Sequence, residues 1–284
     1  MSAQLRCGER TLALDSPVVM GGLNLTPDSF SDGGRYLDPD QALARALQIE
    51  AEGAALIDLG GESTRPGAAP VSAAEELRRV LPLLERLRPR TRAILSVDTS
   101  KPEVIRAAAA AGADLINDVY ALRAPGALEA AAESGCAVCL MHMQGEPRTM
   151  QHAPHYEDVV REVRAFLGER VTACRAAGIP DERIVLDPGF GFGKTLEHNL
   201  TLLRHLHRVR AEGRPVLAGL SRKSMIGALT GKLAGERIHG SVAAALIAAQ
   251  NGADILRAHD VAATVDALQV LHAVGGPDQR GEPA

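Results

Sequence analysis

The sequence predicts a single α/β domain, a (β/α)8 or TIM barrel preceded by a short N-terminal hairpin. Eight short apolar runs alternate with helical patterns along the 284 residues, which is the order of eight successive strand–helix units. The runs are continuous rather than alternating in polarity, as expected for parallel strands that are buried on both faces. A doubly wound open sheet is the alternative architecture that the same pattern allows.

The predicted strands are spaced along almost the whole chain. They are residues 18–24, 55–60, 93–98, 114–119, 137–143, 184–188, 215–221 and 254–259. Helical patterns lie between them, for example at residues 41–52, 72–87, 102–111 and 241–251. Three strands begin in near-copies of one segment: Gly53-Ala-Ala-Leu-Ile-Asp, Gly112-Ala-Asp-Leu-Ile-Asn and Gly252-Ala-Asp-Ile-Leu-Arg. This internal similarity supports a fold built from repeated packing units.

Local signals mark where the helices start and stop. Glycine tolerates the left-handed conformation that follows the last helical residue. The glycines that end helical patterns are Gly53, Gly112, Gly135, Gly178, Gly213 and Gly252. Ser72 with Glu75, and Ser100 with Glu103, fit the S-x-x-E capping box at a helix start.

The elements divide the chain into three parts. Residues 1–16 form the hairpin, which we expect to plug the bottom of the barrel, residues 17–274 form the barrel, and residues 275–284 form a flexible tail.

Composition excludes several classes of protein. The net charge of −4 gives no electrostatic footprint for nucleic acid. No segment reaches the roughly 18 consecutive apolar residues of a membrane span, and Asp15 and Pro17 interrupt any signal-peptide core. Four cysteines in a chain of this length do not indicate a disulfide framework, so we expect a cytoplasmic protein. Aromatic residues make up only 2% of the chain, so its core must be aliphatic.

Each predicted strand ends in a polar residue that a buried strand does not need for its structure. In chain order these are Asn24, Asp58, Asp98, Asn117, His142, Asp187, Ser221 and Arg257. One such residue alone would more often be a cap or a loop anchor. Because the carboxyl ends of barrel strands meet on one face, eight of them in register predict a functional site there.

The residue types on this face indicate two kinds of ligand chemistry. The basic and hydroxyl residues follow the last two strands, where barrels commonly hold phosphate: Ser221, Arg222, Lys223, Arg257 and His259. The carboxylates Asp58, Asp98 and Asp187 and the amides Asn24 and Asn117 suit a planar heterocycle with several N–H donors and ring-nitrogen acceptors. Long loops at residues 26–34 and 60–67 have the composition of lids.

Two segments resemble other motifs without fitting them. Residues 188–195 look like a P-loop, but Pro188 stands where its first glycine is required. Cys136 and Cys139 form a C-x-x-C on a predicted strand, where residues three apart point to opposite faces, so we interpret them as core residues.

Two long motifs closely resemble signatures of the dihydropteroate synthase family. They are Met20-Gly-Gly-Leu-Asn-Leu-Thr-Pro-Asp-Ser-Phe-Ser-Asp-Gly-Gly34 and Asp58-Leu-Gly-Gly-Glu-Ser-Thr-Arg-Pro-Gly67. Further matches follow in family order at residues 96–102, 116–118, 141–143, 186–194, 221–224 and 257–260. The resemblance therefore spans about residues 18 to 261.

The resemblance implies a transferase of folate biosynthesis. Such an enzyme condenses 6-hydroxymethyl-7,8-dihydropterin diphosphate with p-aminobenzoate (4-aminobenzoate), giving 7,8-dihydropteroate and pyrophosphate. It also implies Mg²⁺ as cofactor, small-molecule substrates, a homodimer and inhibition by sulfonamides that compete with p-aminobenzoate.

The resemblance further implies roles for individual residues. Asp98, Asn117, Asp187 and Lys223 would hold the pterin, with Met141 packed on its ring. Asn24 would coordinate Mg²⁺ at the diphosphate. Thr64, Arg65, Arg257 and His259 would bind phosphates. The p-aminobenzoate pocket would comprise Phe30, Pro66, Phe192, Lys223 and Ser224, and Asp32 would stabilise a cation at the pterin methylene.

Two positions depart from the family pattern. Gly22 replaces a branched aliphatic residue, and Ala258 is smaller than usual, so both affect the expected fit of the pocket.

Two other functions compete with the synthase. A methyltransferase that acts with methyltetrahydrofolate and a corrinoid protein would share the barrel and the pterin pocket but would not need the diphosphate residues. A paralogue that binds pterin without synthase activity would be expected to have a damaged lid or diphosphate site.

Overall fold

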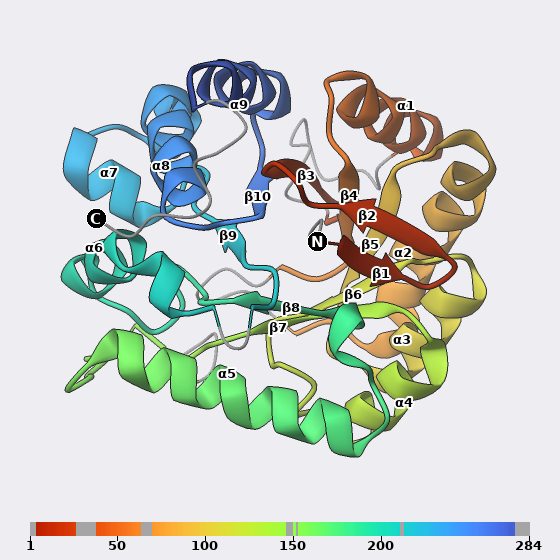
Figure 1. The fold of residues 1–284 in the computed structure, drawn as a ribbon. Helices are drawn as coiled ribbons and strands as arrows, with labels where there is room; N and C mark the ends of the chain where they lie inside the picture. The colour runs from red at the N-terminus through yellow and green to blue at the C-terminus, as the bar shows by residue number, and fades with distance from the viewer. Residues whose placement is uncertain are drawn as a thin grey trace.

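Eight parallel strands form the barrel in the computed structural model, which describes residues 4–26, 38–63, 70–145, 150–151, 153–210 and 213–275 (Figure 1). The strands are β3 (Val18–Asn24), β4 (Leu56–Gly60), β5 (Ile94–Asp98), β6 (Leu115–Asp118), β7 (Ala137–Met141), β8 (Ile184–Asp187), β9 (Leu217–Gly219) and β10 (Ile255–Ala258). They pair in the order β8-β7-β6-β5-β4-β3-β10-β9. A bridge between Leu186 and Val216 joins the two outermost strands, so the sheet closes and the open doubly wound alternative is excluded.

Helices surround the barrel and alternate with its strands (Figure 1). They are α1 (Pro39–Ala51), α2 (Ala73–Leu87), α3 (Pro102–Ala110), α4 (Ala127–Ser134), α5 (Val159–Ala176), α6 (Leu196–Arg204), α7 (Ser224–Thr230), α8 (Ile238–Gln250) and α9 (Val261–Gly275). Short 3-10 turns are η2 (Arg88–Arg90), η3 (Asp181–Arg183), η4 (Leu206–Arg208) and η5 (Ala234–Glu236). None of the helices in the described ranges combines the length and apolarity that a membrane crossing requires.

Of the two predicted capping boxes, the one at α2 shows the N-cap bond and the one at α3 is wrong. Ser72 does cap α2, because its hydroxyl accepts a hydrogen bond from Glu75 N at 3.2 Å. At α3 the N-cap residue is Lys101, with Pro102 at the first helical position. Proline fixes the start of this helix, and Ser100 instead hydrogen-bonds the buried carboxyl group of Asp118.

The predicted hairpin is present and covers the end of the barrel at which the strands begin. β1 (Gln4–Cys7) pairs with β2 (Arg10–Ala13), with a turn at Gly8 that has a φ of +59°. Leu5 and Cys7 are fully buried in one apolar cluster with the barrel-interior residues Met20, Leu56, Leu115, Val185 and Ile255. The hairpin therefore closes the interior of the barrel at this end (Figure 1).

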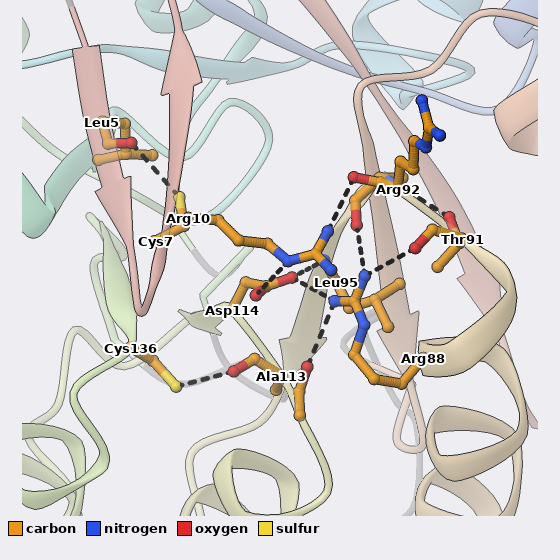
Figure 2. Close-up of polar contacts among 12 residues, drawn as sticks. Leu5, Cys7, Arg10, Arg88, Thr91, Arg92, Leu95, Ala113, Asp114 and Cys136 are labelled. Carbon is orange, nitrogen blue, oxygen red and sulfur yellow. Dashed lines mark hydrogen bonds and ion pairs between the residues drawn. The ribbon is translucent and has the colours of Figure 1, made fainter.

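Polar contacts attach the hairpin to the barrel (Figure 2). The Asp114 carboxylate accepts hydrogen bonds from Leu95 N at 2.8 Å and from Arg88 Nη1 at 2.6 Å. Arg10 of the hairpin lies 3.6 Å from the same carboxylate and donates to Arg92 O at 3.0 Å. These contacts pair the charged groups at this end of the barrel. We therefore assign these groups a role in stability and not in ligand binding.

The two cysteines of the C-x-x-C motif pack in different layers, as predicted. Cys136 belongs to the outer core between the barrel and its helices, and its thiol lies 3.1 Å from Ala113 O (Figure 2). Cys139 belongs to the cluster inside the barrel. The tail predicted at residues 275–284 lies outside the described residues except for Gly275, the last residue of α9.

Candidate active site

A buried aspartate joins three strands at the carboxyl end of the barrel. Asp58, on β4, is fully buried. Its carboxylate accepts hydrogen bonds from Ser96 Oγ at 2.6 Å, Asn117 Nδ2 at 3.2 Å and Arg257 Nε at 2.7 Å. Asn117 lies on β6 and Arg257 on β10, so Asp58 fixes an amide and a guanidinium group that come from opposite directions around the barrel.

The guanidinium group of Arg257 also faces Asp98. Arg257 Nη2 lies 3.8 Å from Asp98 Oδ2. Burial raises the pKa of Asp98, and the neighbouring Asp58 charge raises it further, although Arg257 opposes the shift. Burial lowers the pKa of Arg257, but Asp58 and Asp98 more than offset this, so its pKa is raised and it carries a charge.

Gly22 and Ala258 have different consequences for the pocket. A Cβ at Gly22 would lie 3.4 Å from Arg257 Cζ, so the glycine leaves space for the guanidinium group. Ala258 is buried in the outer core, on the side of β10 opposite to Arg257. Of the two departures, only Gly22 borders the site.

Asn24 and Asp98 approach each other across Gly60. A Cβ added to Gly60 would lie 3.4 Å from Asn24 Oδ1 and 3.9 Å from Asp98 Oδ2. The absence of a side chain at Gly60 therefore leaves an amide oxygen and a carboxylate oxygen facing a common space.

Asp187 ends β8 and is held by the loop that follows it. Gly189 N donates to Asp187 Oδ1 at 2.7 Å. Burial raises the pKa of Asp187, while Lys223 and this hydrogen bond act in the opposite direction. Gly189 has a φ of +67°, and a Cβ there would lie 1.9 Å from His142 O, so only glycine fits this position.

Lys223 lies against the same loop at the N-terminus of α7. Its Nζ donates to Phe190 O and lies 4.9 Å from the centre of the Phe192 ring. Burial lowers the pKa of Lys223 to about 8, although Asp187 opposes this shift. Phe192 also packs on a small apolar cluster that contains Met141 at the end of β7. Ser224, the first residue of α7, is exposed.

The residues predicted to bind phosphate lie in and around the loops after β9 and β10. His259 Nδ1 lies 3.1 Å from Ser221 Oγ, which also accepts from His259 N at 3.2 Å. Arg222 has a left-handed φ of 59° and forms an ion pair with Asp260, through Nε at 3.0 Å. The Arg222–Asp260 pair thus links the two loops that carry Ser221 and His259.

His142 differs from the other strand-end residues. Its Nδ1 lies 2.9 Å from Lys194 Nζ, and its ring makes an edge contact with Phe166 of α5, at 5.0 Å between centroids. Burial and the neighbouring Lys194 lower its pKa to about 2. The prediction that all eight strand-end side chains point into one site is therefore wrong for His142, which packs toward the outer layer.

Five predicted site residues lie outside the described residues. They are Phe30, Asp32, Thr64, Arg65 and Pro66. Their roles stay predictions. Of the loop after β4, Glu62 is described, and its Oε1 accepts from Val71 N at 3.1 Å.

Sequence reasoning missed how three residues organise the site. Asp58 was predicted as one of the carboxylates that suit a heterocycle, whereas in the structure its carboxylate is the partner of both Asn117 and Arg257. Asp260 follows His259 directly and pairs with Arg222. Lys194 lies in the segment that looks like a P-loop, and it is buried behind the loop after β8.

The fold and site define a class of protein: a closed (β/α)8 barrel with an acidic and amide pocket beside basic residues at the strand ends. The model of the pterin binding enzyme family matches residues 20–259. The dihydropteroate synthase of Escherichia coli K12 is 54% identical over 263 residues, which are 93% of this chain and 93% of that protein. The chain therefore belongs to the dihydropteroate synthase family of pterin binding enzymes.

Solved structures are similar over nearly the whole chain. A Xanthomonas albilineans dihydropteroate synthase with 4-aminobenzoic acid has a TM-score of 0.91 and 58% identity, covering 97% of this chain and 99% of that one. Another, in complex with 7,8-dihydropteroate, has a TM-score of 0.88 and 55% identity, covering 96% and 99%. A Yersinia pestis dihydropteroate synthase in complex with a sulfonamide drug has a TM-score of 0.92 and 53% identity, covering 96% and 99%.

Proposed function

We propose that this protein is a dihydropteroate synthase, a transferase that forms a C–N bond between 6-hydroxymethyl-7,8-dihydropterin diphosphate and p-aminobenzoate, releasing pyrophosphate. The observation that carries the proposal is the network around Asp58. It joins Asn117, an amide suited to a pterin edge, to Arg257, a cation suited to diphosphate, within one buried set of contacts. The relatives with bound 4-aminobenzoic acid and 7,8-dihydropteroate support the same reaction.

Hydrogen-bond chemistry explains how the pocket would recognise the pterin. Asp187, which is buried, and Asp98, which is partly buried, are acceptors for ring N–H and amino groups, and such contacts are strongest where water is excluded. Asn117 offers its amide oxygen, since its Nδ2 is engaged by Asp58. Met141 provides an apolar contact for the flat ring.

Positive charge would stabilise the departing diphosphate. The bond between the pterin methylene carbon and the diphosphate oxygen breaks, and its electron pair leaves with the diphosphate. Arg257 and His259 bind the phosphate oxygens, and Arg257 is already oriented by Asp58, so little reorganisation is needed as charge develops. The arylamine nitrogen then bonds the methylene carbon and loses a proton to water. Asp32 would stabilise the methylene cation between these events, and no covalent nucleophile is required.

The residues around Asn24 fit a Mg²⁺ ion that is shared with the substrate. Mg²⁺ usually binds through one or two protein oxygens, substrate phosphates and water. Asn24 Oδ1 supplies such an oxygen beside Asp98, and the described ranges contain no group of three or more His, Cys, Asp or Glu that could hold a metal. When bound, the ion would neutralise charge on the diphosphate.

Pyrophosphate release tests this function. Purified protein with Mg²⁺, p-aminobenzoate and the pterin diphosphate should release pyrophosphate and form dihydropteroate, and EDTA should stop the reaction. Sulfonamides should compete with p-aminobenzoate. Pterin binding without release would overturn the proposal in favour of the inactive paralogue, and methyl transfer from methyltetrahydrofolate to a corrinoid protein would favour the methyltransferase.

We also propose a cytoplasmic homodimer. All four cysteines are free and buried, which suits a reducing compartment. Exposed apolar side chains occur along consecutive elements from α7 to α9: Leu229, Leu233, Ile247, Val270 and Val274. A second copy could cover this surface. Sedimentation velocity should give a dimer that Ile247→Asp weakens, and a monomer at micromolar concentration would contradict the proposal.

A further inference from the structure

Lysine is scarce in this chain and is concentrated near the site. Only four of its 31 Lys and Arg residues are lysines: Lys101, Lys194, Lys223 and Lys232. Lys223 belongs to the proposed pocket, whereas Lys194 is 3% exposed and has no role in the proposed reaction. A chain that mostly uses arginine thus has a lysine at this buried position.

The Lys194 ammonium group binds three acceptors at short distance. Its Nζ lies 2.9 Å from each of Gly189 O, Phe192 O and His142 Nδ1, and 3.4 Å from His142 O. An ammonium group has three N–H donors, so the three short contacts use all of them. A compact ammonium can reach acceptors that converge on one point, whereas the planar fork of an arginine cannot. Lys194 therefore fastens both ends of the turn 189–192 to the end of β7.

This turn needs an anchor because of its backbone conformation. Gly189, Gly191 and Gly193 all have left-handed φ values, of +67°, +80° and +62°. Alternating glycines lose more conformational entropy on ordering than other residues. Two further contacts hold the segment: Tyr156 Oη donates to Gly193 O at 2.8 Å, and Gly191 N donates to Asn199 Oδ1 at 2.7 Å.

The same turn holds the lysine of the pocket. Phe190 O accepts from Lys223 Nζ, and the Phe192 ring lies 4.9 Å from that nitrogen. Two lysines therefore bind one short turn through different carbonyl groups. Lys194 binds Gly189 O and Phe192 O and so holds the turn in place. The turn then places Phe190 O and the Phe192 ring against Lys223.

We propose that Lys194 is a positioning residue, which sets the place of Lys223 and Phe192 at the p-aminobenzoate end of the site. The proposal rests on the proposed function for its kinetic consequences and on the contacts above for its structural ones. Burial, together with the charge of Lys223, lowers the pKa of Lys194 to about 7, although the charge of Asp187 opposes this shift. Burial thus opposes the charged form of Lys194, and an apolar side chain at this position could not make its contacts with Gly189 O, Phe192 O and His142 Nδ1.

Kinetics of Lys194→Met test the functional half. The KM for p-aminobenzoate should rise by about tenfold or more, and the Kd of the free pterin should rise by a smaller factor, because Asp98 and Asn117 remain in place while Lys223 and the turn that holds Asp187 are displaced. Lys194→Arg should not restore the KM. Ile105→Ala, which removes fully buried side-chain atoms of α3, is the matched control for lost stability and should leave both constants unchanged. An unchanged KM for p-aminobenzoate in folded Lys194→Met would overturn the proposal.

Lysine NMR tests the structural half without any enzymatic activity. With ¹³Cε-labelled lysine the chain gives four side-chain signals, which Lys→Arg variants assign. In Lys194→Met, the titration midpoint of Lys223 should rise from about 8 toward 10.5, because Lys223 loses the fixed, buried surroundings that lower its pKa.

Tyr156→Phe separates the effect of position from that of charge. This variant removes the hydrogen bond to Gly193 O without changing any charge, and it should move the Lys223 midpoint in the same direction by a smaller amount. Tyr156→Phe also tests the proposal if Lys194→Met does not fold. A Lys223 midpoint that stays constant in both variants would refute the proposal even if wild-type protein released no pyrophosphate, so this failure is distinct from failure of the proposed function.

Discussion

At the scale of single residues, the site separates recognition of the heterocycle from recognition of the diphosphate. Asp187 lies on β8 and contacts the loop after that strand, whereas His259 follows β10 and contacts Ser221. Because these contacts belong to different loops, substitutions at the two positions should affect different parts of the substrate.

Asp187→Asn should weaken binding of the free pterin by about 100-fold, because a charge-assisted hydrogen bond in a buried site becomes a neutral one or is lost. His259→Ala should change binding of the free pterin by less than about threefold and weaken the pterin diphosphate by about tenfold or more. Calorimetric titration of both ligands into both variants measures these effects. Equal binding of free pterin by wild type and Asp187→Asn would refute the role of Asp187.

The pH dependence of kcat/KM for the pterin diphosphate should have two limbs. Burial lowers the pKa of Lys223 to about 8, so its positive charge is lost as the pH rises through that value. Burial raises the pKa of Asp187, so its carboxylate is lost, as the pH falls, at a higher pH than an ordinary aspartate would require. Activity should therefore decrease on both sides of neutrality.

Lys223→Arg checks the assignment of the alkaline limb, because arginine stays charged throughout the accessible range. The limb near pH 8 should disappear from the profile of this variant, whatever its maximal rate. If the limb persists unchanged, another group titrates there.

The sequence predicted which residues make up the candidate site but not which of them pair with one another. Asp98, Asn117, Asp187 and Arg257 could be found because polar residues at the ends of buried strands have no structural explanation. Which of them pair is decided by side-chain directions across the barrel, so the joint role of Asp58 was not predictable. His142 shows the opposite case: its position at a strand end fitted the pattern, but its ring packs against Phe166 and Lys194.

At the scale of elements, all eight strands were predictable and their ends were less so. Continuous apolar runs identify buried parallel strands wherever they occur. β9 is limited to Leu217–Gly219, shorter than the predicted 215–221, and β7 stops at Met141, two residues before the predicted end. In both cases the shortening leaves the following residues free for loop contacts, such as that of His142 with Lys194.

Gly189→Ala should damage the loop after β8. Its Cβ would lie 1.9 Å from His142 O, and the φ of +67° disfavours any side chain, so the loop must move. We expect a loss of at least about 2 kcal/mol in the free energy of unfolding and an increased KM for p-aminobenzoate. Urea unfolding and initial rates measure the two effects.

Gly178→Ala is the matched control for this prediction. Gly178 follows α5 with a φ of +86°, and a Cβ there would meet nothing within 4 Å. It carries the conformational cost of roughly 1–2 kcal/mol without the collision, and its activity should equal that of wild type. Similar KM values for the two variants would show that the contact with His142 does not shape the site.

At the scale of the whole molecule, the barrel assigns stability and ligand recognition to opposite ends. The hairpin and the Asp114 network close the end where the strands begin (Figures 1 and 2). The polar residues of the site occupy the other end. The few aromatic residues follow the same division. All those described lie on elements from β6 to the loop after β8: Tyr120, Tyr156, Phe166, Phe190 and Phe192. An aliphatic core builds the repeated units, and aromatic rings are kept for the side of the barrel that carries Asp187 and Lys223.

This division predicts that Asp114→Asn destabilises the protein without changing its reaction. Asp114 accepts hydrogen bonds from Arg88 and Leu95 and faces Arg10 of the hairpin, so the variant leaves a mostly buried guanidinium group without its carboxylate partner. The free energy of unfolding should fall by about 3 kcal/mol. Glu133→Gln, which breaks an exposed ion pair with Arg106, should change it by less than about 1 kcal/mol.

Urea unfolding measures the stability of both variants, and kcat and KM are compared at a temperature where each remains folded. Both constants should equal those of wild type, because the network and the site lie at opposite ends of the strands. A changed KM in folded Asp114→Asn would mean that the hairpin end of the barrel influences the site through the strands, contrary to the division of roles inferred from the fold.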